Sequence, residues 1–383
     1  MPLNRIDVPG LSGERFRVIY HLSGTRQEAE MTAQGIALEQ TVEFPDDLVP
    51  LGDIQDSIVG QIETLDELDD GRHAVTISYA VETAGDELTQ LLNVIFGNSS
   101  IKPGIRVESF DLPASLLAKF KGPRFGKVGI RDLVGVADRP LLCTALKPMG
   151  LSPEHLADQA YQFALGGIDV IKDDHGLANQ PFCPYEERVL RCAEAVAKAN
   201  AEMGRAAIYM PHISAPADKL VDRALFAKQA GAGGLLVCPG LIGMDAMRLL
   251  ADDDRIDLPI MSHPAFQGSF VVSPDSGLSH YALYGEMMRL AGADATVYPN
   301  YGGRFSFSRS ECRAIVAGCT AQMDHIKPIF PTPGGGMGLD RIADMHQVYG
   351  TDVIYLIGGG LHRAGPDLVE NSRRFNALVS QLM

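Results

Sequence analysis

The chain has 383 residues, 46% of them apolar, and its 33 basic and 48 acidic residues give a net charge of −15. This length suits one large domain and a smaller one, and the negative charge argues against a surface for nucleic acid or anionic membranes. We find neither a run of 18 apolar residues nor an apolar signal core, so we expect a cytoplasmic protein without a membrane span. The six cysteines lack CxxC spacing, which predicts free thiols.

The first part of the chain predicts an α+β domain of the ferredoxin-like kind over residues 1–125. Its strand candidates are FRVIYHLSG (16–24) and HAVTISYAVE (73–82), its helix candidate is QEAEMTAQGIALEQTVE (27–43), and LLNVIFGNS (91–99) follows them. A Pro/Gly-rich junction, KGPRFGKVGIRD (121–132), leads into the second domain, which we place at residues 126–383.

The second domain repeats one pattern, in which a short apolar run is followed by a turn and an amphipathic stretch. Eight such runs occur, namely 141–147, 167–174, 206–212, 233–240, 258–264, 295–300, 326–332 and 353–360. Helix candidates such as SPEHLADQAYQFALGG (152–167) lie between them. A doubly wound sheet would usually carry a glycine fingerprint after its first strand, whereas this turn reads KPMGLSPE. The pattern therefore predicts a (β/α)8 TIM barrel.

In such a barrel the chemistry lies at the C-terminal ends of the strands. The densest cluster of polar residues lies in VIKDDHG, at the end of the second predicted strand. Alternation along a strand would send Lys172 and Asp174 to the barrel mouth and Asp173 away from it, with His175 able to turn back toward the mouth. Carboxylate oxygens suit Mg²⁺, and Lys172 could join them only uncharged, for example as a carbamate. An ion pair between Lys172 and an aspartate is the alternative.

Glycine triplets follow the seventh and eighth predicted strands, where barrels place phosphate groups on backbone N–H donors. PTPGGGMG (331–338) contains Gly335 and Gly336, and IGGGLH (357–362) contains Gly359 and Gly360. Tight left-handed turns are the other explanation of these glycines. Lys147, at the end of the first strand, is a candidate acid or base, or else a surface lysine with an acidic partner. His263, in MSHP, is a proton-transfer candidate or a structural histidine.

Several of these motifs together resemble the RuBisCO large-chain superfamily. They are FKGPRFG, TALKPMGLS, GGIDVIKDDHGLANQPFCPYEERV, PTPGGGMG and YLIGGGLHRAGP, in this order along the chain. The resemblance implies that Lys147 handles enolisation, that carbamylated Lys172 and Asp174 bind Mg²⁺, and that His263 lies in the active site. It also implies that Gly335, Gly336, Gly359 and Gly360 bind a substrate phosphate.

The resemblance further implies a homodimer whose active sites are shared between subunits. Glu39, in ALEQTVEFP, and Asn93, in LLNVIFGN, resemble residues that reach the partner's barrel. We therefore expect a sugar-phosphate substrate, a second copy of the chain as partner, and neither nucleic acid nor membrane as ligand.

The departures from the family pattern indicate a different reaction from CO₂ fixation. His175 stands where the family has a glutamate ligand, so it either binds the metal through a ring nitrogen or marks a site that dispenses with metal and carbamate. KPMGLS lacks the second lysine of the family's KPK motif, and Pro264 replaces a phosphate-binding arginine. The loop after strand 6 carries Arg304 near the place of the mobile catalytic lysine. A monophosphate substrate is expected.

With these departures the chain resembles RuBisCO-like proteins, and the resemblance implies an ability to stabilise an enediolate next to a carbonyl. By resemblance, the KDDH variant favours the apiose-pathway group. We therefore expect a carbon–carbon lyase that decarboxylates 3-oxo-isoapionate 4-phosphate, or acts on it by transcarboxylation or hydrolysis. The alternatives are a methionine-salvage enolase or isomerase acting on a methylthio sugar phosphate, and a catalytically silent paralogue that binds a sugar phosphate.

Overall fold

The structure is a computed structural model that describes residues 5–383. The chain divides into two compact units. The first contains the chain up to Phe120 together with residues 267–286 and 322–326, and the second contains residues 121–266, 287–321 and 327–383. Relative to the expected division between 125 and 126, residues 267–286 and 322–326 thus belong to the first unit. One reason is that strand β10 (Gly277–Leu278) pairs with the sheet of that unit.

The first unit has the ferredoxin-like order of two βαβ halves. Its elements are β1 (Arg15–Leu22), α1 (Arg26–Glu39), β2 (Gln61–Glu67), β3 (His73–Ala80), α2 (Leu88–Phe96) and β4 (Ile105–Asp111). The sheet runs β10-β4-β1-β3-β2, and β1 pairs antiparallel with both β3 and β4. The short helices α3 (Ala114–Leu117) and α10 (Gly268–Val271) also belong to the unit. The expected α+β fold is confirmed.

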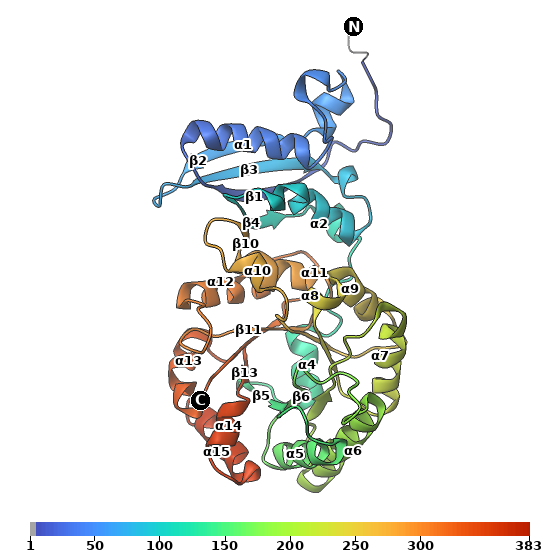
Figure 1. Ribbon diagram of the computed structural model, residues 1–383, viewed down its shortest axis with the longest axis vertical. Coiled ribbons are helices and arrows are strands. Elements are labelled where there is room, and N and C mark those ends of the chain that lie inside the picture. Colours follow the sequence, from blue (N-terminus) through green and yellow to red (C-terminus); the bar gives the residue numbers. More distant parts are fainter. Residues whose placement is uncertain (1–4) are drawn as a thin grey trace. The chain divides into compact units, whose positions relative to one another are not determined.

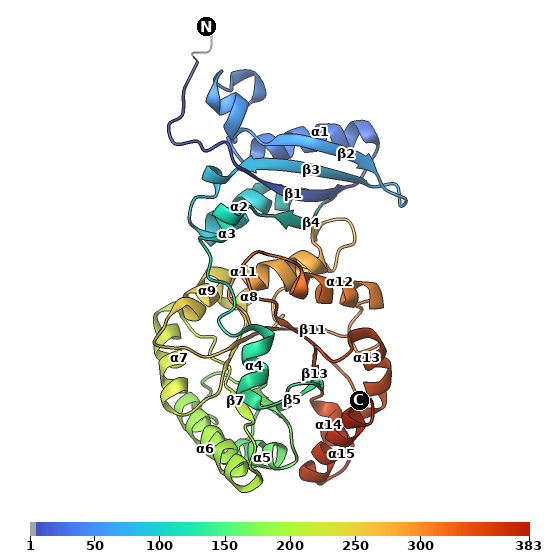
Figure 2. The ribbon, with the colours of Figure 1, turned by 180° about the vertical axis from the view of Figure 1, so that it is seen from behind.

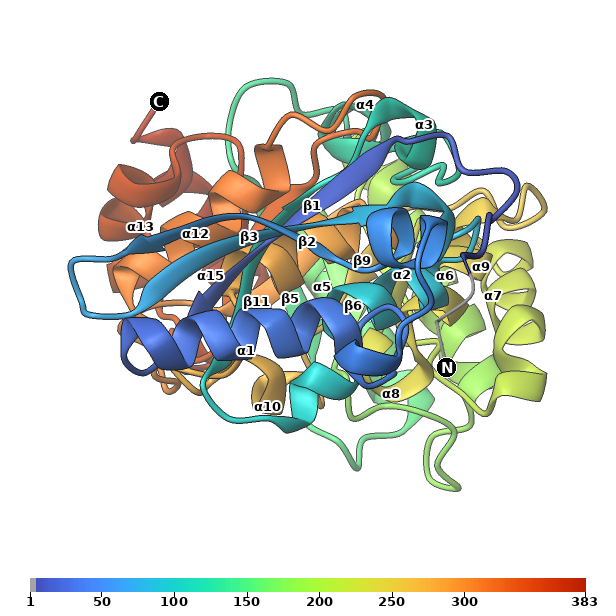
Figure 3. The ribbon, with the colours of Figure 1, turned by 90° about the horizontal axis from the view of Figure 1, so that it is seen from above.

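Local sequence explains these elements. Phe16, Val18, Tyr20 and Leu22 alternate along β1 and are all buried, so one face of this strand forms core. Helix α1 begins at a capping box in which Thr25 and Glu28 satisfy each other's backbone N–H groups. Its buried residues are small apart from Ile36, which allows the helix to lie closely along the sheet (Figure 3).

The second unit is the expected (β/α)8 barrel. Its eight parallel strands are β5 (Leu141–Leu146), β6 (Val170–Asp173), β7 (Ile208–Met210), β8 (Leu235–Val237), β9 (Ile260–Ser262), β11 (Ala295–Pro299), β12 (Phe330–Gly334) and β13 (Ile354–Leu356). They form the arcs β13-β5-β6-β7 and β12-β11-β9-β8. A bridge between His212 and Leu236 joins the arcs on one side, and Gly334 lies against Leu356 on the other.

Helices surround these strands (Figures 1 and 2). They are α4 (Gly126–Val134), α5 (Pro153–Leu165), α6 (Tyr185–Met203), α7 (Leu220–Gln229), α8 (Pro239–Ile242), α9 (Met244–Asp252), α11 (Met288–Leu290), α12 (Arg309–Thr320), α13 (Ile342–Tyr349), α14 (Gly359–Arg363) and α15 (Leu368–Ser380). Ser152 caps α5 ahead of Pro153 at its first turn, as the sequence indicates. Among the described residues, none of these helices combines the length and apolarity that crossing a membrane requires.

Apolar side chains from the strands fill the interior of the barrel. Leu141, Val170, Met210, Leu236 and Phe330 belong to this core and are fully or almost fully buried. The barrel is therefore packed and not a pore, and polar side chains gather at the C-terminal ends of its strands.

Candidate active site

Lys147 directly follows β5 and forms an ion pair at the barrel mouth. Its Nζ donates to Oδ2 of Asp174 at 2.7 Å, and the two side chains are 30% and 20% exposed. Gln159 of α5 holds the backbone of Lys147 from both sides, since its Nε2 donates to the Lys147 carbonyl at 2.5 Å and its Oε1 accepts from the Lys147 N–H at 3.1 Å. The ammonium group is thus presented from a fixed backbone.

Lys172 is the second lysine of the site and lies inside the barrel. It is 2% exposed, and its strand register pairs it with Ala145 and Met210. Its Nζ donates to the backbone carbonyl of Asp173 at 3.1 Å. Burial lowers the pKa of Lys172, against the opposing pull of Cys143 and Asp174. The lowered pKa makes the uncharged amine, which is the form that reacts with CO₂, easier to form than in an exposed lysine.

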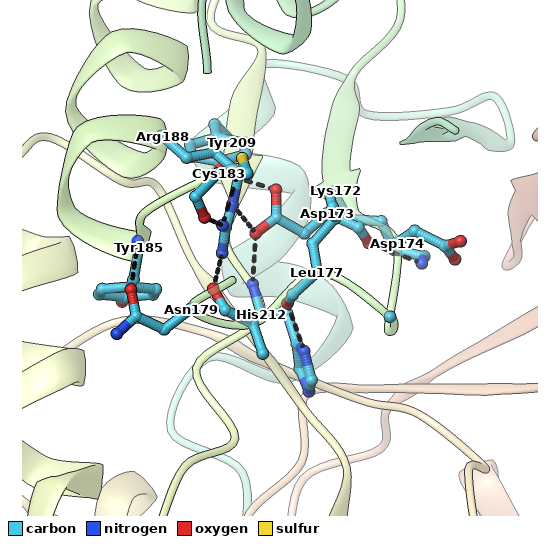
Figure 4. Close-up of polar contacts among 12 residues, drawn as sticks. Lys172, Asp173, Asp174, Leu177, Asn179, Cys183, Tyr185, Arg188, Tyr209 and His212 are labelled. Atoms are coloured by element: carbon cyan, nitrogen blue, oxygen red, sulfur yellow. Dashed lines mark hydrogen bonds and ion pairs between the residues drawn. The ribbon is translucent and has the colours of Figure 1, made fainter. Parts of the chain in front are cut away.

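Asp173 points the other way, toward α6, as strand alternation predicts (Figure 4). Its carboxylate accepts from Nε of Arg188 at 3.1 Å, the hydroxyl of Tyr209 at 2.8 Å and the N–H of His212 at 3.0 Å. Burial disfavours charge on Arg188, but the Asp173 carboxylate outweighs it and raises the Arg188 pKa. Arg188 also donates to the carbonyls of Ala178 and Cys183. Asp173 is thus the internal anchor of the loop after β6.

Asp174 and His175 begin this loop and lie at the mouth. Oδ1 of Asp174 accepts from the His175 N–H at 3.1 Å and lies 3.2 Å from Nδ1 of the same ring. Burial opposes ionisation of Asp174, but the hydrogen bonds from His175 and Lys147, with the positive charge of Lys172, outweigh it and hold the Asp174 pKa well below its ordinary value. The site therefore contains a permanent carboxylate.

His263, after β9, stacks on His175. Their ring centroids are 4.3 Å apart and the planes differ by 17°. Burial lowers the pKa of His263 well below its ordinary value, and the neighbouring Lys172 and His175 act in the same direction. Nδ1 of His263 accepts the N–H of Ala265 at 3.2 Å, so a neutral ring carries its proton on Nε2. His263 is thus a neutral imidazole able to donate a hydrogen bond.

His212 follows β7 and has a structural role, because it holds the loop that follows β6. Its Nδ1 donates to the carbonyl of Leu177 at 2.8 Å, and its Nε2 lies 3.4 Å from Sγ of Cys238. Burial lowers the pKa of His212. The ring therefore ties the loop after β6 to the ends of β7 and β8.

The two glycine segments come together at the ends of β12 and β13. Gly335 and Gly336 have φ values of 88° and 89°, in the region that favours glycine. Gly360 lies directly against the carbonyl of Met337, where a Cβ would collide with it. Gly358, at the start of the second segment, lies beside the side chain of Lys147. The structure thus groups the glycine segments with the lysine and carboxylate cluster.

Glu39 and Asn93 belong to the first unit. Glu39 ends α1 and accepts from Nδ2 of Asn98 at 3.0 Å. Asn93 lies in α2, and its carbonyl accepts from Nε2 of Gln40 at 2.7 Å. Gln40 therefore ties the end of α1 to α2 and brings the neighbourhoods of Glu39 and Asn93 together. Their contribution to a partner's barrel stays a prediction.

The donor set at the mouth fits a divalent cation. Asp174 Oδ1 and His175 Nδ1 are an oxygen and a nitrogen donor 3.2 Å apart, and a bound cation would take the place of the hydrogen bond that now joins them. Lys172 supplies the third donor only as a carbamate, which its lowered pKa favours. The described residues contain no group of three His, Cys, Asp or Glu side chains placed to hold a metal ion. A site here therefore depends on Lys172.

Comparison with known proteins identifies the family. Residues 127–366 match the model of the ribulose bisphosphate carboxylase large chain, catalytic domain. The chain belongs to the RuBisCO large-chain family. It is 39% identical to ribulose bisphosphate carboxylase-like protein 1 of Rhodopseudomonas palustris, over 96% of this chain and 98% of that protein. RuBisCO-like membership is thus shown for nearly the whole chain.

The relatives of this RuBisCO-like chain include proteins whose names state an enzymatic activity. It is 37% identical to a 5-methylthioribulose-1-phosphate isomerase of Rhodospirillum rubrum, over 96% of both chains. It is 32% identical to a 2,3-diketo-5-methylthiopentyl-1-phosphate enolase of Bacillus licheniformis, over 95% of this chain and 91% of the enolase. These names agree with the enolase and isomerase alternative, and the apiose-pathway assignment has no support from them.

Solved structures agree with the fold. A RuBisCO-like protein from Rhodopseudomonas palustris has a TM-score of 0.86 and 40% identity, with 96% of this chain and 97% of that one covered. A RuBisCO described as dimeric, from Hyperthermus butylicus, has a TM-score of 0.85 and 25% identity, with 98% and 92% covered. The barrel with its N-terminal sheet domain is therefore the family's architecture.

Sequence reasoning missed several residues of this site, among them Arg188 and Tyr209, which hold Asp173, and Gln159. Gln159 lies twelve positions beyond Lys147 in the middle of α5, yet it makes both backbone hydrogen bonds that hold Lys147. A polar residue in an amphipathic helix usually faces solvent, so nothing in the pattern distinguishes Gln159 from its exposed neighbours.

Proposed function

We propose that this protein moves a proton next to the carbonyl of a sugar monophosphate and thereby forms or isomerises an enol or enediolate. One observation carries the proposal: the Lys147–Asp174 pair, buried Lys172 and the stacked His175 and His263 rings lie at one barrel mouth with both glycine segments. This grouping offers a proton carrier, hydrogen-bond donors for a developing oxyanion, and backbone N–H groups for phosphate.

Each side chain has a role that its surroundings allow. Lys147 handles the proton, because its Nζ reaches the mouth. As a neutral amine it would accept the proton from the carbon next to the carbonyl, and the ammonium that results, paired with Asp174, would return it to the enolate. His263 donates its Nε2 proton toward the enolate oxygen, since a neutral ring is retained there. Lys172 as carbamate, Asp174 and His175 would hold Mg²⁺, which when bound polarises the carbonyl as a Lewis acid.

The apolar side chains around the mouth support a methylthio sugar phosphate as substrate. Large exposed apolar residues follow five of the barrel strands. Met149, Phe182, Phe266 and Phe305 lie on loops, and Leu241 lies in the short helix α8. Met149 lies over Gly176, next to His175. An uncharged thioether end can contact such side chains, whereas a second phosphate or a carboxylate would lack a partner among them. The isomerase and enolase relatives point to the same substrate class.

Decarboxylation of 3-oxo-isoapionate 4-phosphate stays a prediction. Loss of CO₂ from a β-keto acid leaves the same enolate, so the site described here would stabilise that intermediate as well. A carboxylate substrate would, however, need a cation that is not already paired with Asp174. We therefore place this reaction second.

We also propose a homodimer in which Glu39 and Asn93 serve the partner's site. Gln40 holds their two helices together, and the side chain of Glu39 is presented at the end of α1. The dimeric RuBisCO of Hyperthermus butylicus supports this assembly by likeness.

Proton NMR in D₂O tests the proposal. The protein with Mg²⁺ and bicarbonate is incubated separately with 5-methylthioribulose 1-phosphate, 2,3-diketo-5-methylthiopentyl 1-phosphate and 3-oxo-isoapionate 4-phosphate, with EDTA as control. We expect deuterium to enter a carbon next to the carbonyl of a methylthio substrate. Release of CO₂ from the third compound alone would contradict the proposal and support the lyase reaction. If none of the three compounds reacts while phosphate ligands still bind, the protein is the catalytically silent paralogue.

A further inference from the structure

Met149 is an exposed apolar side chain at the barrel mouth. It follows Lys147 and Pro148 in the loop after β5, at the place of the second lysine of the family's KPK motif. The residue is 52% exposed, so packing of the barrel core does not account for it. A Cβ on Gly176 would lie 2.7 Å from Cε of Met149. Gly176 does not have a positive φ, so the close approach of this methyl group explains the missing side chain better than the backbone conformation does.

The contact between Met149 and Gly176 continues the pairing of β5 with β6 beyond the ends of the two strands. Within the strands, each residue of β5 lies opposite the residue 27 positions further along the chain. Lys147 and Asp174, which form the ion pair, have the same spacing. Met149 and Gly176 keep it two residues further on. Met149 therefore lies one step further out from the barrel interior than the ion pair, and it is more exposed than either of its members.

The order of groups around the mouth indicates which part of a substrate would reach Met149. Strand β5 lies between β13 and β6. On the β13 side, Gly358 of the second glycine segment lies beside the side chain of Lys147. On the β6 side lies the contact of Met149 with Gly176. A sugar phosphate with its phosphate on the glycine segments and its reacting carbon at Lys147 would thus have its other end on the β6 side, beside Met149.

The surroundings of Met149 favour an uncharged end. The basic residues nearest to it in the two loops are Lys147 and His175, and both interact with Asp174. An anionic end would have to compete with that carboxylate. A thioether or alkyl group would instead cover the exposed surface of a flexible and polarisable side chain, and removal of both apolar surfaces from water is favourable.

We propose that Met149 contacts the end of the substrate opposite the phosphate and makes the site select an alkylthio end over a hydroxyl end. The inference rests on the proposed function, because it takes a sugar monophosphate as the ligand of this mouth. Met149 is a specificity-determining residue in this proposal and takes no part in proton transfer. Its replacement should therefore change the ratio of affinities for two ligands that differ only at that end.

The test uses a matched pair of ligands. 5-Methylthioribulose 1-phosphate and ribulose 1-phosphate differ in carrying a methylthio or a hydroxyl group at the end opposite the phosphate. Calorimetry in EDTA measures both affinities for the full-length wild type, Met149→Gln and Met149→Leu, with circular dichroism as a check on folding. Met203→Gln is the control, because Met203 is 42% exposed at the end of α6.

We expect the wild type to bind the methylthio ligand about tenfold or more tightly than the hydroxyl ligand. Met149→Gln, which keeps the length of the side chain but makes its end polar, should reduce this preference about threefold to tenfold. Met149→Leu and Met203→Gln should keep the preference within about twofold of the wild type, since the former retains an apolar contact and the latter leaves the mouth unchanged.

Three results would overturn the proposal. They are a wild type that binds neither ligand, a wild type without preference, and an equal loss of affinity for both ligands in Met149→Gln, which would mean that Met149 only positions the loops after β5 and β6. The proposed function fails separately. If the preference depends on Met149 while Mg²⁺ brings no deuterium into the methylthio compound, the contact stands and the proposed function does not. If deuterium enters but Met149→Gln keeps the preference, the proposed function stands and the contact does not.

Discussion

The carboxylate of Asp173 lies 3.1 Å from Nε of Arg188, and both side chains are completely buried. Asp173 directly precedes Asp174 and His175 in the chain. Arg188 also donates hydrogen bonds to carbonyls of the loop that these two residues begin. The position of the candidate metal ligands thus depends on an ion pair that faces the opposite side of β6.

Breaking this pair should destabilise the fold strongly. Asp173→Asn leaves the buried Arg188 charge uncompensated, and we expect a loss of about 3–5 kcal/mol in the free energy of unfolding. Urea denaturation followed by circular dichroism measures it. Glu187→Gln, which alters an exposed pair with Arg191, is the matched control and should change stability by less than about 1 kcal/mol. Similar small effects in both variants would contradict the structural role of Asp173.

Much of the fold could be predicted because its strands are apolar and its turns contain glycine. Seven of the eight barrel strands fall within the expected runs, and β12 (Phe330–Gly334) extends two residues beyond its run, which was expected to end at residue 332. Strands buried on both sides are recognisable because they read as continuous apolar segments. Strand β2, QIETLDE, was not predicted, because it is an edge strand with no buried residue. Helix α2 was not assigned as a helix because the apolar spacing becomes visible only when Leu88 is included.

The candidate site was only partly predictable. Residues at strand ends could be named, because topology alone brings them to one mouth. Their partners could not, since the Asp173–Arg188 pair and the Gln159 clamp on Lys147 are through-space contacts from helices. The pairing of β10 with β4 has the same character, because it joins segments more than 160 residues apart in the chain.

Removing the Gln159 clamp should affect catalysis more than binding. Gln159→Leu loses both hydrogen bonds to the Lys147 backbone, which lets the ammonium shift relative to the substrate. We expect kcat to fall about tenfold to a hundredfold, while KM and the affinity for inorganic phosphate stay near the wild-type values. Gln162→Leu, on the same helix but bonded to Asp158, is the control. A rise in KM with unchanged kcat would assign Gln159 to substrate binding.

Lys172 should be essential for turnover without being needed for folding. Its buried amine makes a single hydrogen bond, so Lys172→Met replaces a desolvated polar group by an apolar one of similar length. We expect an unfolding midpoint equal to or above that of the wild type, and loss of activity by about a thousandfold or more. Lys172→Ala should lose activity to the same extent, and its unfolding midpoint should fall because the shorter side chain leaves a cavity. Unchanged activity in either variant would remove Lys172 from the mechanism.

Acid should destabilise the fold through His212. Its pKa is lowered in the folded state by burial, so below the ordinary histidine pKa of about 6.5 the unfolded chain binds a proton that the folded chain does not. Stability is therefore complete above about pH 6.5 and falls as the pH drops, with a limiting slope of about 1.4 kcal/mol per pH unit for one group. In His212→Asn, whose amide can still donate to Leu177, the loss between pH 7 and pH 5 should be smaller. Equal losses in urea titrations would show that His212 protonates freely in the fold.

Metal binding should depend on the residue at position 175. An imidazole is a weaker ligand for Mg²⁺ than a carboxylate, so His175→Glu should bind Mg²⁺ more tightly than the wild type and His175→Ala more weakly. Asp174→Asn should abolish binding, because it removes the one carboxylate whose pKa is held low at the mouth. Calorimetry with Mg²⁺ in bicarbonate buffer measures these affinities without reference to activity, and Lys172→Met reports on the carbamate. If His175→Glu and His175→Ala bind Mg²⁺ as the wild type does, His175 serves the stacked pair with His263 and is not a ligand.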